Sequence, residues 1–177
     1  QAFTQRQIME ADPVLKQKYV DPYDARPEKG ENILAILQRP ALIYNGMIYP
    51  VRHLSVRGFI WYQGESNRSD GMLYARLCTA MLKGWRRDFD QGNLPFYFVQ
   101  LPAYSWGKHD STAYEYALLR EAQASMLSIK NTGMAVTMDV GEPDNIHPHN
   151  KKPVGIRLAK VALHDTYGYR DIVDEGP

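Results

Sequence analysis

The sequence predicts an α/β protein built around a parallel sheet, and two observations carry this prediction. Three short apolar runs rich in aromatic and β-branched residues begin at positions 58, 96 and 134, and so at equal intervals of 38 residues. Continuous apolar runs without alternation are typical of strands buried on both faces, as in a parallel sheet. Helical patterns lie between and after these runs, and alternation of strand and helix at this spacing indicates βαβ units.

Each element of this pattern has its own signal. The expected strands are residues 58–62, 96–101 and 134–138. Between the first two, apolar residues from Leu73 to Phe89 recur at three- and four-residue steps and predict an amphipathic helix. A similar stripe predicts a helix over Tyr116 to Ile129. A third helix is expected to start near Pro153, because the missing N–H of proline is not needed in a first helical turn.

The first 57 residues show a weaker pattern. Ile8 to Tyr19 is compatible with a helix, residues 21–31 are a loop rich in proline and charge, and residues 33–48 are an apolar stretch broken by Pro40 and Gly46. No architecture is predicted for this region.

Composition and charge exclude several classes of protein. Of the 177 residues, 44% are hydrophobic and 23% are charged, which is the globular range and not that of a disordered or fibrous chain. Lys and Arg number 21 against 20 Asp and Glu, with no basic stripe, so no nucleic-acid partner is expected. The apolar runs are far shorter than the ~20 residues that span a bilayer, so no membrane partner is expected either. The single cysteine, Cys78, excludes an internal disulfide and a multi-cysteine zinc site.

The loop after the third expected strand carries an acid and an imidazole three residues apart, Asp144 and His147. A carboxylate at this distance can hold one ring nitrogen and leave the other free to act as a base, which is the orienting half of a serine-type hydrolase. The structural alternative is an exposed loop with a helix-capping acid. The D-x-x-H pattern alone does not decide between them, because four-residue coincidences are common.

A second polar cluster, Gln63-Gly64-Glu65-Ser66-Asn67, follows the first expected strand. In open parallel sheets ligands bind beyond the carboxyl ends of the strands, so both clusters are expected at one edge of the sheet. The Gln63 amide is a donor placed where a developing oxyanion could be met. The alternative is a simple turn, in which Gly64 serves backbone geometry, Glu65 braces the loop and Asn67 is a turn or capping residue.

These motifs, in this order, closely resemble the sialate O-acetylesterases of the SGNH hydrolase superfamily. The resemblance extends from about residue 39 to 165 and is carried by residues 44–48, 57–67, 98–101, 144–148, 150–151 and 155–159. The run from Trp61 to Asn67 combined with Asp144 to Pro148 is its most specific part.

The resemblance implies a three-layer α/β/α sandwich with a parallel sheet, no metal or other cofactor, and hydrolysis of acetyl esters on sugar hydroxyls. It implies His147 as general base, Asp144 as its orienting acid, and Gln63 as part of the block that builds the oxyanion hole. The neighbouring Gly64, Glu65 and Asn67 are carried over as oxyanion or substrate contacts. An acetylated sugar is the implied substrate, and a secreted, periplasmic or lysosomal location is the implied setting.

The sequence departs from the family at the nucleophile. The family's serine lies in a short Gly-x-Ser motif on a strand that precedes everything matched here, and this sequence has no such element. Ser66 lies inside a matched loop and is interpreted as a loop hydroxyl. We therefore expect residues 1–177 to be the C-terminal part of a single esterase domain, truncated at both ends and inactive alone. Its expected partner is the missing N-terminal segment of the same protein.

Three alternatives to a sialate-type esterase follow from the same residues. One is a carbohydrate-binding module or pseudo-esterase that has kept the cleft without the nucleophile. Another is an esterase of the acetylxylan type, because the family also includes enzymes for plant polysaccharides. Metal-dependent hydrolysis through Asp144, His147 and His149 is disfavoured, because a zinc site needs three ligands on a supported geometry.

Overall fold

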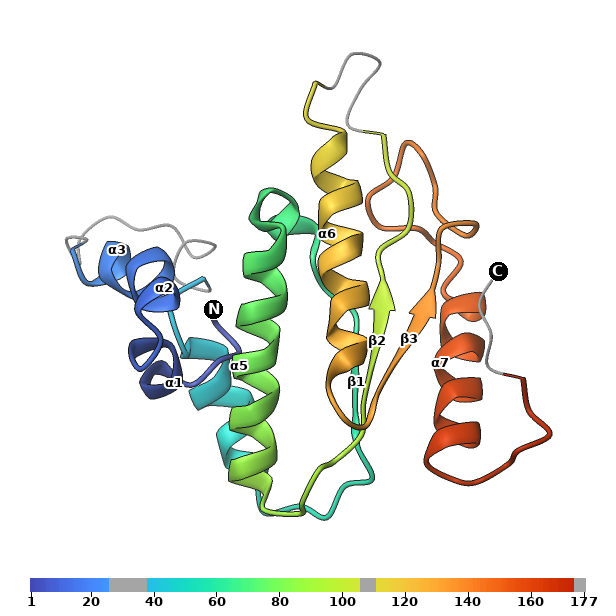
Figure 1. Ribbon diagram of the computed structural model, residues 1–177, viewed down its shortest axis with the longest axis horizontal. Helices are drawn as coiled ribbons and strands as arrows, with labels where there is room; N and C mark the ends of the chain where they lie inside the picture. Colours follow the sequence, from blue (N-terminus) through green and yellow to red (C-terminus); the bar gives the residue numbers. More distant parts are fainter. Residues whose placement is uncertain (26–37, 106–110, 174–177) are drawn as a thin grey trace. The chain divides into compact units, whose positions relative to one another are not determined.

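The structure is a computed structural model that describes residues 1–25, 38–105 and 111–173 (Figure 1). The chain divides into two compact units, residues 1–55 with 76–92 and residues 56–75 with 93–177. Helix α5 (Met72–Phe89) begins in the second unit and continues in the first. Within the described ranges, no helix is both long and apolar enough to cross a membrane.

The first unit consists of short helices together with most of α5. Its elements are α1 (Arg6–Glu10), α2 (Pro13–Leu15), η1 (Lys16–Val20), α3 (Asp21–Asp24), η2 (Tyr44–Ile48) and η3 (Tyr49–Val51). Residues 8–19, whose sequence is compatible with one helix, are interrupted at Asp12, whose carboxylate accepts hydrogen bonds from the N–H groups of Val14 (3.0 Å) and Leu15 (3.2 Å). An aspartate at a helix start satisfies N–H groups that have no partner within the helix, and so begins a new helix there.

The second unit contains the parallel sheet. Its strands are β1 (Phe59–Trp61), β2 (Phe96–Gln100) and β3 (Thr132–Val136), in the order β1-β2-β3. Both pairings are parallel, with Phe96 opposite Phe59 on one side and Thr132 on the other. The central strand β2 is buried along most of its length, as its unbroken apolar sequence predicts.

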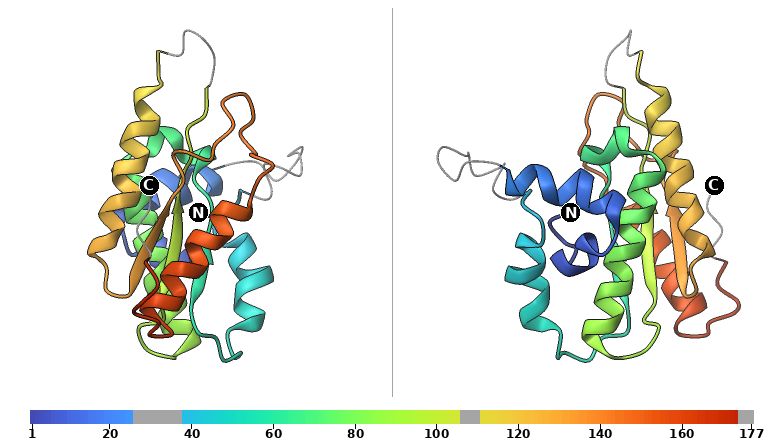
Figure 2. Two further views of the ribbon diagram at one scale, coloured as in Figure 1. Left: turned by 90° about the vertical axis from the view of Figure 1, so that its right-hand side faces the viewer. Right: turned by 60° about the vertical axis from the view of Figure 1, so that its left-hand side comes forward.

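Helices cover both faces of this sheet. The side chain of Gln100, at the end of β2, donates a hydrogen bond to Arg120 O in α6 (Tyr114–Ser125). The hydroxyl of Tyr97 lies 2.7 Å from Oγ1 of Thr166, the residue that follows α7 (Lys152–Asp165). Side chains three positions apart on a strand project to opposite faces. Helices α6 and α7 therefore pack on opposite faces, as Figure 2 shows. This layering confirms the predicted α/β fold with helices on both sides of a parallel sheet.

Helix α6 is joined to the sheet by a buried amide. Gln123 accepts a hydrogen bond from Leu101 N–H (3.0 Å) and donates to Val99 O (3.2 Å). Only 1% of Gln123 is exposed, so both ends of its amide are satisfied in the core.

Two elements differ from the sequence expectation at their ends. Strand β3 covers residues 132–136 and not 134–138, because Gly133 packs closely against Tyr97 and Val161, where an added Cβ would lie 2.9 and 2.6 Å from their side-chain atoms. After Val136 the chain leaves the ladder, and the Thr137 hydroxyl donates to Gln100 O instead (2.6 Å). Helix α6 ends at Ser125 and is followed by the 3₁₀ turn η5 (Met126–Ser128). The start of α7 at Lys152, with proline in its first turn, confirms the expectation at Pro153.

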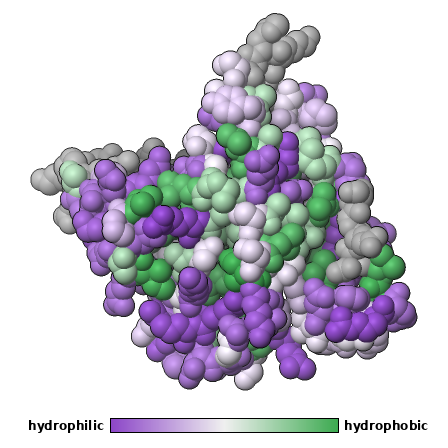
Figure 3. Space-filling model, viewed as in Figure 1, coloured by the Kyte–Doolittle hydropathy of each residue, from purple (hydrophilic) through white to green (hydrophobic). Residues whose placement is uncertain are grey.

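The surface mixes hydrophilic and hydrophobic residues on the face drawn in Figure 3. In the second unit the exposed large apolar side chains include Ile60, which is 70% exposed on β1, and Ile156 on α7. Among the described residues β1 pairs with β2 and with no other strand.

Candidate functional site

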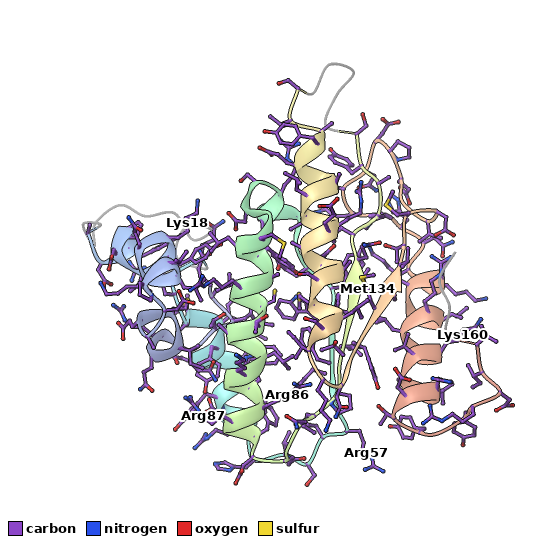
Figure 4. All side chains as sticks on the ribbon, viewed as in Figure 1. Lys18, Arg57, Arg86, Arg87, Met134 and Lys160 are labelled. Atoms are coloured by element: carbon purple, nitrogen blue, oxygen red, sulfur yellow. The ribbon has the colours of Figure 1, made fainter. Side chains whose placement is uncertain are left out.

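The carboxyl ends of the three strands lie together at one end of the second unit. The strand arrows point toward this end in Figure 1, where the 3₁₀ helix η4 (Glu65–Asp70) follows β1 and the loop 137–151 follows β3. Arg57, which precedes β1, lies at the opposite end (Figure 4). All the residues singled out from the sequence as site residues are on this carboxyl edge.

The turn after β1 fixes the amide of Gln63. Gln63 Nε2 donates to Asn67 Oδ1 (2.8 Å), and Asn67 Nδ2 donates in turn to Asp70 Oδ2 (2.7 Å). A carboxylate only accepts hydrogen bonds, so Asp70 turns the Asn67 amide and leaves its oxygen facing Gln63. An amide nitrogen has two N–H donors, and one bond to Asn67 therefore leaves Gln63 a second donor.

Gly64 is required by the geometry of this turn. Its φ of +154° is one that residues with a side chain rarely adopt, and an added Cβ would lie 3.0 Å from Leu101 Cδ1 and 3.4 Å from Gln123 Nε2. Gly64 N–H donates to Glu65 Oε2 (3.0 Å), and the Tyr74 hydroxyl donates to Gln63 O (2.7 Å). The chain after β1 thus lies directly against β2 and α6.

The charge of Glu65 acts on two tyrosines, Tyr62 and Tyr116. Burial, with the charge of Glu65 as a second cause, raises the pKa of Tyr62 to about 12. The same two causes raise the pKa of Tyr116. Both phenols are therefore neutral hydrogen-bonding groups at physiological pH.

In the loop after β3, Asp144 and His147 are both exposed. Among the described residues no hydrogen bond joins the Asp144 carboxylate to the His147 ring, and none joins a serine hydroxyl to that ring. Their assigned roles remain predictions. The contact that the structure gives His147 is through its backbone N–H, which donates to Asn145 Oδ1 (2.9 Å).

The same loop contains a carboxylate and imidazole pair that the sequence did not single out. Glu142 Oε1 accepts a hydrogen bond from His149 N–H (2.6 Å), and Glu142 Oε2 lies 3.0 Å from His149 Nδ1. Asn145 Nδ2 also donates to Glu142 Oε2 (3.1 Å). The hydrogen bonds from His149 lower the pKa of the Glu142 carboxyl. Spacing gave no signal for this pair, because Glu142 and His149 are seven residues apart with no regular element between them.

Asp139 and Arg157 fasten the base of this loop. Arg157 donates to both carboxylate oxygens of Asp139, at 2.7 and 2.6 Å, and to Val136 O at the end of β3 (2.7 Å). This two-point ion pair lowers the pKa of Asp139. Arg157 of α7 is therefore hydrogen-bonded both to the end of β3 and to the start of the loop that follows it.

Three contacts tie the carboxyl-edge loops together. The loops after β2 and β3 meet at Ser105 N–H, which donates to Pro143 O (2.9 Å). They also meet at Gly141, where an added Cβ would lie 2.5 Å from Ala103 O. The loops after β3 and β1 meet at Lys151, whose Nζ lies 3.4 Å from the Tyr62 hydroxyl and 4.6 Å from its ring centroid. The Gln63 turn and the His147 loop thus share one edge of the sheet.

Two further features bear on ligands at this edge. Among the described residues, no group of three or more His, Cys, Asp or Glu side chains is arranged to hold a metal ion. The sequence of the loop after β2 offers Tyr104, Trp106 and His109 as candidates for a sugar-facing surface. Tyr104 is among the residues that the structure describes, whereas Trp106 and His109 lie outside them.

A parallel α/β unit with polar loops gathered at the carboxyl edge of its sheet is the architecture of many hydrolases and nucleotide-binding proteins. Comparison with known proteins narrows this class. Residues 29–164 match the family described as carbohydrate esterase, sialic acid-specific acetylesterase. The chain belongs to this family.

Individual relatives agree with the family match. The chain is 33% identical over 155 residues to a sialate O-acetylesterase of Rattus norvegicus, covering 77% of this chain and 28% of that protein. It is 31% identical over 155 residues to the sialate O-acetylesterase of Homo sapiens, covering 77% of this chain and 29% of that protein. Each alignment thus covers less than a third of the relative.

A solved structure agrees as well. The crystal structure of a carbohydrate acetylesterase from Xanthomonas citri superposes with a TM-score of 0.70 and 43% sequence identity, covering 75% of this chain and 31% of that chain.

Proposed function

We propose that this chain carries the base and oxyanion portion of a serine-type esterase that removes acetyl groups from sugar hydroxyls. The observation that carries the proposal is the Lys151 contact to Tyr62, which ties the loop of His147 to the turn of Gln63 at one edge of the sheet. Family membership supports the acetyl ester as the bond that is hydrolysed. The names of the sialate O-acetylesterase relatives support an acetylated sialic acid as the substrate class. An ester of the acetylxylan type stays the alternative.

In the proposed mechanism His147 is the general base. Its ring takes the proton of a serine hydroxyl as the oxygen attacks the acetyl carbonyl, and Asp144 holds the other ring nitrogen and stabilises the imidazolium. The carbonyl oxygen becomes an oxyanion, to which the second N–H of Gln63 donates. When the ester bond breaks, His147 gives the proton to the departing sugar oxygen and an acetyl-enzyme remains. Water, deprotonated by the same ring, then releases acetate.

The serine is proposed to come from polypeptide outside these 177 residues. The one Gly-x-Ser stretch of the sequence, Gly64-Glu65-Ser66, lies inside the matched turn after β1 and not on a strand ahead of the matched motifs, and the chain covers less than a third of its relatives. Among the described residues β1 pairs with β2 and with no second strand, and Ile60 is exposed on it, which supports a preceding segment that pairs with this strand. We propose that this segment belongs to the same protein and that the chain alone is inactive.

The first test replaces the two proposed catalytic residues in the full-length protein. With a chromogenic acetyl ester, kcat/KM is expected to fall by about 10⁶-fold in His147→Ala and about 10⁴-fold in Asp144→Asn, the scale found for base and acid in serine proteases. His53→Ala, at an exposed histidine of the first unit, is the matched control and should retain full activity. Activity that survives the His147 change would reject these roles. Acetylated sugar bound without turnover by the unaltered protein would favour the binding module.

A further inference from the structure

The polar contacts around His147 form a chain that begins at Glu142. Glu142 Oε2 accepts from Asn145 Nδ2 (3.1 Å), and Asn145 Oδ1 accepts from the backbone N–H of His147 (2.9 Å). The main chain of Glu142 and Asn145 is also paired, since Asn145 N–H donates to Glu142 O (3.1 Å). Both ends of the Asn145 side chain are thus occupied, one by a carboxylate and one by the residue proposed as the base.

The Glu142 carboxylate decides how the side-chain amide of Asn145 is oriented. A carboxylate has no proton to donate, so the NH₂ group of Asn145 must face Glu142 and its oxygen must face the other way. Asn145 Nδ2 also lies 3.2 Å from His149 Nδ1, so Glu142 Oε2 and this ring nitrogen are the two groups beside the NH₂ end of the amide. Without the carboxylate, an amide that turned over would place its NH₂ group against the His147 N–H, donor against donor. The lowered pKa of Glu142 keeps this acceptor ionised at neutral pH.

Glu142 is itself held by two contacts with the far side of the loop. His149 approaches one of its oxygens through its backbone N–H and the other through its ring. Residues 147 to 149 are therefore anchored on both sides of the buried Pro148, at His147 through Asn145 and at His149 directly. These contacts fix the backbone from which the His147 ring projects.

We propose that Glu142 is a positioning residue that acts through Asn145 to fix the backbone of His147. This inference rests on the proposed role of His147 as general base. The turn after β1 is built in the same way, with Asp70 acting through Asn67 on Gln63. A carboxylate and an asparagine therefore support each of the two residues with proposed chemical roles, Gln63 and His147.

The test is a double-mutant cycle in the full-length protein, using a chromogenic acetyl ester. Glu142→Ala and Asn145→Ala are each expected to lower kcat about 10-fold, the effect of one lost hydrogen bond, with KM within about 2-fold of the unaltered protein. Because both residues act along one chain of contacts, the double variant should be no slower than the slower single variant. Glu121→Ala, an exposed glutamate on α6, is the control and should not change kcat.

A second readout does not depend on activity. Hydrogen exchange of the peptide containing the His147 amide should become faster in Glu142→Ala and in Asn145→Ala, and stay unchanged in Glu121→Ala. Unchanged exchange, or kinetic effects that add in the double variant, would overturn the inference. These outcomes are distinct from failure of the proposed function, which would show as activity retained in His147→Ala.

Discussion

Two asparagine side chains contact the two residues with proposed chemical roles, Gln63 and His147. In each case a carboxylate accepts a hydrogen bond from the NH₂ group of the asparagine, so that the amide oxygen faces Gln63 or His147. Asn67 stands between Asp70 and Gln63, and Asn145 stands between Glu142 and His147. Only Asn67 was singled out from the sequence, as a turn residue or a ligand contact. The structure gives it a supporting task, since its oxygen holds the Gln63 amide.

A prediction at the residue scale concerns Gly64. Gly64→Ala should lower the free energy of unfolding by about 1 to 3 kcal/mol, because the φ of +154° is strained for a residue with a Cβ. The added methyl group would also lie 3.0 Å from Leu101 Cδ1. Chemical denaturation followed by circular dichroism measures the change.

Gly155→Ala is the control for this measurement. Gly155 lies in α7 with nothing within 4 Å of an added Cβ, so alanine there should stabilise the protein by up to about 1 kcal/mol. Equal changes in the free energy of unfolding in Gly64→Ala and Gly155→Ala would contradict backbone strain at Gly64 as the cause.

At the scale of elements, the helix and strand types followed from periodicity, but their ends did not. The three apolar runs and the stripe that became α5 were located correctly because burial sets the pattern of apolar residues. Both ends of β3 were misplaced by two residues, because they depend on packing, at Gly133 against Tyr97 and Val161, that lies outside the apolar run itself. Met134, on β3 in Figure 4, was taken as the first residue of the strand and is the third.

The ion pair that joins Asp139, in the loop after β3, to Arg157 in α7 gives a prediction about pH. The Arg157 guanidinium lowers the pKa of Asp139 in the folded protein, so the stabilisation is present above the unfolded pKa of about 4 and is lost as the pH falls through the lower folded value. Asp139→Asn should therefore lower Tm at pH 7. The difference from the unaltered protein should shrink progressively below pH 4.

Calorimetric scans at several pH values check this prediction. Asp165→Asn, an exposed carboxylate at the other end of α7, is the comparison variant and should show a smaller effect at pH 7. A Tm difference for Asp139→Asn that stays constant down to pH 2 would contradict the ion pair as its cause.

At the scale of the whole molecule, the proposed mechanism needs a nucleophilic serine from outside these 177 residues. We predict that a serine-reactive phosphonate applied to the full-length protein labels a serine outside these 177 residues. Peptide mass spectrometry locates the label, and His147→Ala should greatly slow labelling because the base no longer activates the hydroxyl. A label on Ser66 or on any other serine of this chain would contradict the proposal. The prediction that residues 1–177 are part of a single domain would be tested in the same protein by its complete structure.

Sequence alone determined the α/β class, the parallel sheet and the two polar clusters, because apolar periodicity and the position of loops relative to strands are local properties of a chain. It also determined the family, through a combination of short motifs in a fixed order. Only the tertiary structure decided which polar groups meet. These contacts join residues whose spacing along the chain is irregular. They are the hydrogen bonds of Glu142 with Asn145 and His149, the ion pair of Asp139 with Arg157, and the contact of Lys151 with Tyr62. Such contacts depend on where loops turn in space, which no residue pattern encodes.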